Sequence, residues 1–286
     1  MNFILSYIIL AEIFVIMALS TNFLVGIIGI FSLSQAALMG VGAYTYALAA
    51  MAGVPFPIAV LAAAALCALL NVVTSLPALR LAGDYFVVTS FGLQFIATAL
   101  FVNWSQVTGG ATGIAGIPAP SLFGLSFEEP HYFVVLSTLG MVIGALAYWL
   151  LMRSSYGRVL HAVRLNELAA GAAGRNVLKM KLGISAVSGV YAGAGGALYA
   201  IFMSYIDPSS FDIQVSMVIL TMLVIGGART LAGSLIGPFL LLMIPNVLTL
   251  VHIPPELLGP SRALAFGALL VVFMLWRPQG IAGRRI

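Results

Sequence analysis

Charged side chains are scarce in this sequence of 286 residues: Asp, Glu, Lys and Arg together make up 7%, while hydrophobic residues make up 62%. A soluble domain carries roughly 25% charged residues, so this chain cannot cover itself with a water-compatible surface. From Ile13 to Leu79 no residue carries a formal charge. That length is enough for about three membrane spans of ~20 residues each. The runs are too long, and too rich in Leu, Ala and Gly, for the alternating strands of a membrane barrel.

Cysteine and histidine are also rare. The single cysteine, Cys67, lies inside an apolar run, which excludes an internal disulfide and a thiolate metal cluster. His131, His161 and His252 fall in three separate predicted loops without metal-ligand spacing. No Ser–His or paired-Asp arrangement is visible within the predicted spans, as an intramembrane protease would need. The sequence therefore favours neither an enzyme nor a metal protein.

ATP hydrolysis and ion coupling are two common sources of energy for transport, and neither has a signature in the chain. Its only lysines, Lys179 and Lys181, lie in NVLKMKL, which is not a Gly-rich phosphate loop. Among the ionisable residues, only Glu12 lies well within a predicted span, whereas ion-coupled carriers and channels usually place such groups at mid-membrane. Glu12 is either such a site or a structural residue, and we favour the structural interpretation. We therefore expect the driving force to come from another chain.

Nine apolar segments are candidate spans, and Gly-Pro breaks separate several of them. They cover approximately residues 4–27, 36–52, 56–78, 86–103, 132–152, 182–205, 213–228, 233–251 and 261–276. The seventh and ninth are short for a hydrocarbon core of about 30 Å, so we expect them to be thinned, flanked by snorkelling residues or partly re-entrant. Residues 22–52 fit either a clean crossing or a broken helix. The fold predicted is an all-α transmembrane bundle of about 8–10 spans, with residues 1–286 forming one domain.

Positive charge is concentrated between Arg153 and Lys181, where six of the twelve Lys and Arg residues occupy 29 positions beside one acid, Glu167. Placing this segment in the cytoplasm puts 11 of the 12 basic residues inside and leaves only Arg262 near the outer side. The N-terminus is then external and the C-terminus cytoplasmic. A missed crossing within 22–52 would move the N-terminus alone. Five acids fall on the outer side: Glu128, Glu129, Asp207, Asp212 and Glu256.

Small residues recur at three- or four-residue spacing in the segment SAVSGVYAGAGGALYA. They are Ser185, Gly189, Gly193, Gly196 and Ala200, and similar faces occur at Ala36–Gly40 and Gly233–Gly237. Such faces allow helix backbones to approach closely in a membrane. Simple packing is the interpretation we favour, although mobile transporter interfaces use the same pattern.

Five motifs follow one another along the chain. They are SLSQAALMGVGAYTYAL (32–48), LRLAGDYFVVTSFG (79–92), NWSQVTGGATGIAGIPAPSLFGL (103–125), GRVLHAVRLNELAAGAAG (157–174) and VIGGARTLAGSLIGP (224–238). From about Leu24 to Arg277, the chain resembles the M-type (LivM-like) permease subunits of branched-chain amino acid ATP-binding-cassette (ABC) importers. The GDYF segment and the TGG…GIP loop favour the M-type over its paralogous partner.

The resemblance implies that residues 153–181 are a cytoplasmic coupling loop, containing a short helix that docks in a groove of an ATPase subunit. The coupling residues it implies are Asn166, Glu167, Ala169, Ala170, Gly171 and Gly174. Asn166 or Glu167 can cap the first turn, and Gly171 and Gly174 permit a close approach or a turn. The segment carries an extra leucine, Leu168, relative to a plain Glu-Ala-Ala pattern. We expect a bulky charged residue at Ala170 to uncouple ATP hydrolysis from uptake.

The resemblance also implies alternating access in the bacterial inner membrane. The expected partners are two ATPase subunits, a second permease subunit (an H-type paralogue or a second copy), a periplasmic substrate-binding protein and membrane lipid, without nucleic acid. ATP and Mg would be bound by the ATPase and no cofactor by this chain, a transport subunit and not an enzyme. The outer loops 104–131, 206–212 and 252–260 would contribute to docking of the binding protein. Candidate residues along the translocation path are Gln35, Thr89, Gln94 and Asn103.

The substrate is the least determined property. Branched-chain or other hydrophobic amino acids are expected, and relatives of the same transporter type carry urea, short amides or aromatic acids. A self-sufficient secondary carrier or channel is the alternative from a different class.

Overall fold

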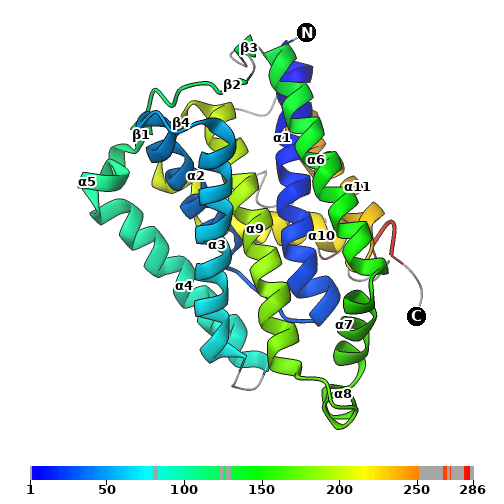
Figure 1. Ribbon diagram of the computed structural model, residues 1–286. Coiled ribbons are helices and arrows are strands. Elements are labelled where there is room, and N and C mark those ends of the chain that lie inside the picture. Colours follow the sequence, from blue (N-terminus) through cyan, green and yellow to red (C-terminus); the bar gives the residue numbers. More distant parts are fainter. Residues whose placement is uncertain are drawn as a thin grey trace.

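The computed structural model describes residues 2–79, 83–122, 125–126, 130–250, 267–268, 271 and 280–283. Helices dominate these residues, in a bundle with one long axis (Figure 1). The principal helices are α1 (Asn2–Thr21), α2 (Gln35–Met51), α3 (Phe56–Ala78), α4 (Gly83–Asn103), α6 (Pro130–Arg153), α9 (Val177–Met203), α10 (Ile213–Gly226) and α11 (Leu231–Leu250). The all-α membrane fold is thus confirmed.

Eight of the nine predicted spans coincide with these helices. The ninth, 261–276, lies outside the described residues except for 267–268 and 271, and the loop 252–260 lies wholly outside them. Within the described part of the chain, five helices are long and apolar enough to cross a membrane: Ile4–Ile28, Phe56–Pro77, Tyr85–Asn103, His131–Arg153 and Val177–Met203. Helix α10 has 14 residues. At 1.5 Å per residue it rises only about 21 Å, so it is short for a ~30 Å core, as expected.

The predicted span at 182–205 begins earlier than expected, at Val177. The side-chain oxygen of Asn176 accepts a hydrogen bond from the backbone N–H of Lys179 (3.0 Å) and caps the helix there. Lys179 and Lys181 therefore belong to α9 and not to the preceding loop. The charge pattern hid this boundary, because a capped helix can start in polar sequence before it enters an apolar environment.

Residues 22–52 form a broken helix and not a clean crossing. Helix α1 continues as a π-helix, η1 (Asn22–Ile28), which ends at Gly29 in the left-handed region (φ 75°). The chain is not helical again until α2 begins at Gln35, a residue only 1% exposed. Two buried backbone N–H groups in the first turn of α2 then need acceptors. Those of Ala36 and Ala37 donate to the side chains of Ser216 (2.8 Å) and Gln94 (2.9 Å).

Helix α9 lies at the centre of the bundle, against α1, α2 and α3 (Figure 1). Its glycines allow backbone-to-backbone contact. A Cβ atom at Gly193 would lie 2.6 Å from the carbonyl oxygen of Ala63 in α3, and one at Gly196 would lie 2.0 Å from that of Met39 in α2. The same holds between α10 and α11, where a Cβ at Gly237 would lie 2.0 Å from the carbonyl oxygen of Met222. The predicted close packing of the small-residue faces is confirmed.

Short elements cover the end of the bundle that holds the N-terminus (Figure 1). They are α5 (Ser105–Thr108), η2 (Gly110–Thr112), β1 (Ile114–Ala115), β2 (Ser121–Leu122), β3 (Leu125–Ser126), β4 (Tyr205–Ile206) and η3 (Pro208–Phe211). Strand β1 pairs antiparallel with β4, and β2 pairs with β3. At Gly113 (φ 70°) a Cβ would lie 2.1 Å from the carbonyl oxygen of Ile206, so only glycine fits beside β4. The β1–β4 pair joins the loops 104–131 and 206–212.

Candidate functional site

The basic segment folds into two short helices at the opposite end of the bundle from the N-terminus (Figure 1). They are α7 (Ser155–Leu165) and α8 (Glu167–Ala172), and we call residues 155–174 the α7–α8 unit. Gly157, Leu160 and Val163 are the buried residues of α7, and they recur at the spacing of one helical face. Helix α7 therefore lies with this face against the spans, while Arg158 on another face is exposed.

Both ends of α8 are capped by local hydrogen bonds. The side chain of Asn166 accepts a hydrogen bond from the backbone N–H of Ala169 (3.0 Å). At the other end, the N–H groups of Gly174 and Arg175 donate to the carbonyls of Gly171 (2.9 Å) and Ala170 (3.1 Å). Gly174 is in the left-handed region (φ 79°), which makes this a Schellman turn. These caps fix a helix that is too short to be stable alone.

The two faces of α8 differ in burial. Ala170 is 7% exposed, whereas Leu168 is 87% exposed, and Leu165, the last residue of α7, is 85% exposed. No other large hydrophobic side chain among the described residues is as exposed as these two. The other sequence-predicted coupling residues, Asn166, Glu167, Ala169, Gly171 and Gly174, are also exposed. Ala170 therefore faces its own chain, and a substitution there would disturb the packing of α8 as well as any docking.

Three side-chain contacts attach the α7–α8 unit to the spans. The Lys181 ammonium nitrogen lies 2.5 Å from a Glu167 carboxylate oxygen. The Tyr156 hydroxyl donates to the carbonyl of Met180 (2.9 Å), and the Arg164 guanidinium donates to the carbonyl of Val25 in η1 (3.3 Å). The sequence did not single out these pairs, because their partners lie on distant or differently oriented helices.

Arg164 sits where η1 ends, beside carbonyls that a helix end leaves without intrahelical partners. Burial, and secondarily the nearby Arg229, lower the pKa of Arg164 to about 10. The side chain therefore stays protonated at neutral pH, and its positive charge suits the C-terminal end of a helix. Burial also raises the pKa of the Tyr156 hydroxyl, so it remains a neutral donor.

Asn22 connects the start of η1 to three other parts of the chain. Its amide nitrogen donates to the Tyr148 hydroxyl (3.0 Å), the Ser234 hydroxyl (2.8 Å) and the Thr230 carbonyl (3.2 Å), and its oxygen accepts from the Arg229 N–H (2.9 Å). A buried amide with four partners fixes the base of α1 to α6 and to the turn between α10 and α11. Sequence reasoning missed this residue, although a lone asparagine in an apolar run was its available signal.

Two of the four candidate path residues meet at the buried start of α2. Gln35 accepts a hydrogen bond from the Ser20 hydroxyl (2.9 Å) and donates to the Ser188 hydroxyl (3.4 Å). Gln94 accepts from the N–H of Ala37 and donates to the Phe211 carbonyl (2.7 Å). Both glutamines are 1% exposed. Their amides satisfy helix ends and neighbouring helices, which is a sufficient structural reason for their presence.

The other two candidates lie elsewhere on α4. The Thr89 hydroxyl donates to the Tyr85 carbonyl of its own helix (2.8 Å), and Thr89 lines a small cavity of about 10 Å³ with Ser34 and Asn71. That volume is about enough for one water molecule. Asn103 is exposed at the end of α4 and donates to the Ala99 carbonyl (2.8 Å). The four residues therefore do not form one site.

Glu12 is buried between α1 and α6. Its two carboxylate oxygens accept hydrogen bonds from the Ser137 hydroxyl (2.5 Å) and the Thr138 hydroxyl (2.6 Å). These hydrogen bonds join α1 to α6, which agrees with the structural interpretation of Glu12. Among the described residues no group of His, Cys, Asp and Glu could hold a metal ion.

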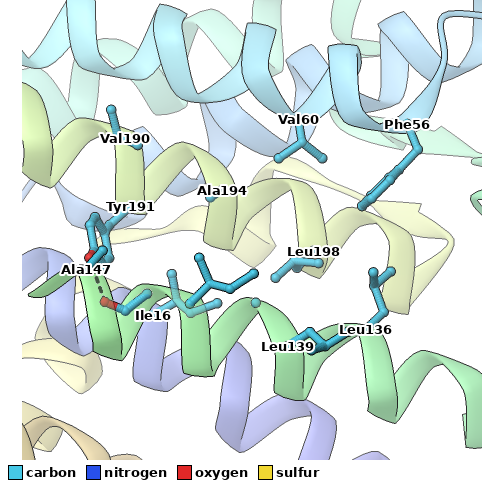
Figure 2. Close-up of a pocket in the computed structure, with 13 residues that line it drawn as sticks. Ile16, Phe56, Val60, Leu136, Leu139, Ala147, Val190, Tyr191, Ala194 and Leu198 are labelled. Carbon is cyan, nitrogen blue, oxygen red and sulfur yellow. Dashed lines mark hydrogen bonds between the residues drawn. The ribbon is translucent and has the colours of Figure 1, made fainter.

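An apolar groove of about 460 Å³ opens between α3 and α6 (Figure 2). Phe56 and Val60 line one wall, Leu139 lies on the other, and Ala194 of α9 lies between them. The one hydroxyl in the lining, that of Tyr191, donates to the Gly144 carbonyl (2.7 Å). The groove thus offers hydrocarbon contact and no free polar group.

The acids at the N-terminal end of the bundle have local structural partners. The Asp212 carboxylate accepts from the N–H of Ile213 (2.6 Å) at the start of α10. Asp207 accepts from the hydroxyls of Ser209 and Ser210. Burial alone would raise the pKa of Asp207, but these hydrogen bonds outweigh it and lower the pKa below its usual value. Glu128, Glu129 and Glu256 lie outside the described residues.

Comparison with known proteins gives consistent matches. The family model of the branched-chain amino acid transport system permease component matches residues 3–275. The chain is 30% identical to the high-affinity branched-chain amino acid transport system permease protein LivM of Escherichia coli (strain K12), over 95% of this chain and 68% of that protein. It is 24% identical to a probable branched-chain amino acid transport permease protein LivM of Methanocaldococcus jannaschii, over 72% and 62%. It is 28% identical to the autoinducer 2 import system permease protein LsrC of Klebsiella pneumoniae, over 59% and 49%. No solved structure matches the chain.

Proposed function

The chain belongs to the family of branched-chain amino acid transport system permease components, and we propose that it carries branched-chain amino acids through the bacterial inner membrane as the permease subunit of an ABC importer. It is a multi-pass membrane protein and a transport component. ATP hydrolysis takes place on separate ATPase subunits, and alternating access moves the substrate inward.

The observation that carries this proposal is the outward face of the α7–α8 unit. Leu165 and Leu168 are highly exposed, and the helices that carry them, α7 and α8, lie at one end of the bundle (Figure 1). Large apolar side chains exposed to this degree and three residues apart in the sequence point to an interaction surface. Exposed basic residues flank them at Arg158, Arg175 and Lys179. This surface suits a partner groove with an apolar floor and an acidic rim, which we assign to the ATPase subunit.

The orientation follows from the same unit. Its end of the bundle is cytoplasmic, since the positive-inside rule places basic loops there. The opposite end, with the β1–β4 pair, then faces the periplasm and receives a substrate-binding protein. The C-terminus is cytoplasmic, and a second permease subunit completes the translocation path.

Reconstitution of the full transporter in proteoliposomes tests the proposal. We expect leucine, isoleucine and valine to be taken up only with ATP and with the binding protein that delivers them. Uptake by this chain alone, without ATP, would show a self-sufficient carrier or channel instead. ATP-driven uptake of urea, an amide or an aromatic acid, with none of leucine, would retain the transporter type and overturn the substrate.

The docking face has its own test, because Leu168 is exposed whereas Ala170 is buried. Leu168→Asp should prevent co-purification of the ATPase without lowering the melting temperature of the permease. Leu168→Met, which keeps an apolar side chain, is the matched control. Equal recovery of the ATPase with both variants would refute docking at this face.

A further inference from the structure

We propose that the ion pair between Glu167 and Lys181 positions α8 on α9, and that through this contact movement of the α7–α8 unit reaches the buried start of α2. The inference rests on the proposed function, because it assumes that an ATPase moves the α7–α8 unit. Glu167 and Lys181 are positioning residues here, since neither touches substrate or nucleotide in the argument.

A half-exposed ion pair adds little net stability, so its place between α8 and α9 points to a positioning role. Among the described residues it is the one salt bridge between side chains. The Lys181 side chain is only 10% exposed, while that of Glu167 is 54% exposed. Desolvation of an ammonium can exceed the attraction of its partner, and an apolar side chain of similar size is often as stable or more so.

Each helix end at this contact is firmly held. Glu167 is the first residue of α8, directly after the Asn166 cap. Lys181 lies in the second turn of α9, and its carbonyl accepts a hydrogen bond from the Ser185 hydroxyl (3.0 Å). A displacement of α8 therefore acts on the base of α9 and is not absorbed by a loose loop.

Above this contact, α9 has little freedom to bend away. Its glycines place it in backbone contact with α3 at Gly193 and with α2 at Gly196. Close-packed interiors transmit displacement because they contain few voids. Two turns above Lys181, the Ser188 hydroxyl and carbonyl contact the Ser20 hydroxyl, and Ser188 also accepts from Gln35 at the start of α2. The same helix thus connects Glu167 to the broken helix.

The neighbouring helix α7 is held separately. Arg164 binds the carbonyl of Val25 at the end of η1. The extended backbone of Asn166 (φ −157°, ψ 106°) separates α7 from α8. A change in the angle between α7 and α8 would therefore move the base of α9 relative to the end of η1. The residues that join η1 to α2 lie between these two points, so this movement would displace them.

The test measures ATP hydrolysis and leucine uptake together in proteoliposomes that contain the complete transporter. We expect Lys181→Met to preserve hydrolysis and to lower the uptake per ATP by about tenfold, within the range of usual coupling energies. Lys181→Arg keeps the positive charge at the same position and should retain most of the ratio. The charge-reversed pair Glu167→Lys with Lys181→Glu should restore most of the ratio.

Equal ratios for Lys181→Met, Lys181→Arg and the unmodified transporter would overturn the inference. If Lys181→Met does not assemble, Glu167→Gln applies the same test at a half-exposed side chain, and an unchanged ratio there would overturn it. A failure of the proposed function looks different, because the unmodified transporter would then show no ATP-dependent leucine uptake.

Discussion

Replacement of Gln94 by leucine should destabilise the protein, and the size of the effect depends on the two hydrogen bonds that Gln94 makes with backbone groups. Leucine has a similar size but cannot accept from the N–H of Ala37 or donate to the carbonyl of Phe211. Both backbone groups would then be left without a partner in a site where Gln94 is 1% exposed. Unpaired backbone groups are poorly tolerated at membrane depth.

The magnitude follows from these two groups. A buried polar group left without a partner costs up to about 3 kcal/mol, whereas an interhelical hydrogen bond in a membrane averages about 0.6 kcal/mol. Two groups therefore give a loss between about 1 and 6 kcal/mol. Thr89→Val is the matched control on the same helix, because Thr89 bonds only to the Tyr85 carbonyl of its own α4. The free energy of unfolding of Thr89→Val should differ from that of the unmodified protein by no more than about 0.5 kcal/mol.

The single cysteine provides the assay. Cys67 is fully buried, and it is the only thiol in the chain. A thiol-reactive fluorescent dye therefore reports unfolding of the detergent-solubilised protein during a temperature ramp. We expect Gln94→Leu to melt several degrees below Thr89→Val. Equal melting temperatures, with an altered substrate preference for Gln94→Leu, would refute the structural role and return Gln94 to the translocation path.

Two further pairs of substitutions test the packing of α9 and the C-terminal cap of α8. Gly196→Ala should lower the melting temperature, because its Cβ would lie 2.0 Å from the backbone oxygen of Met39. Gly92→Ala, where a Cβ would have no atom within 4 Å, should be neutral or slightly stabilising. Identical melting temperatures for the two variants would contradict the close contact of α9 with α2. Gly174→Ala forces an alanine into the left-handed region (φ 79°) and should weaken the C-terminal cap of α8 by about 1 kcal/mol. Gly171→Ala should instead strengthen α8, since this exposed helical position has open space around it. Hydrogen exchange of the α8 amides measures both, and faster exchange in Gly171→Ala than in Gly174→Ala would reverse the reasoning.

Local sequence signals predicted the cytoplasmic features well where the interactions themselves are local. Asn166 caps α8 three residues away, and Gly174 ends it through bonds to Ala170 and Gly171. The local signals did not predict which face of a helix is buried. The position of Ala170 in the motif did not reveal that it faces its own chain while Leu168 faces outward.

The sequence by itself determined the membrane class, the approximate spans and the concentration of charge at one end, because length and apolar composition fix how a helix partitions into a bilayer. Only the tertiary structure decided which polar residues work together. Gln94 bonds to a carbonyl 117 positions away, and Asn22 bonds to Ser234, 212 positions away. Such pairs depend on the depth, tilt and rotation of separate helices. Those quantities are set by backbone contacts such as Gly196 against Met39, which no segment of the sequence specifies alone.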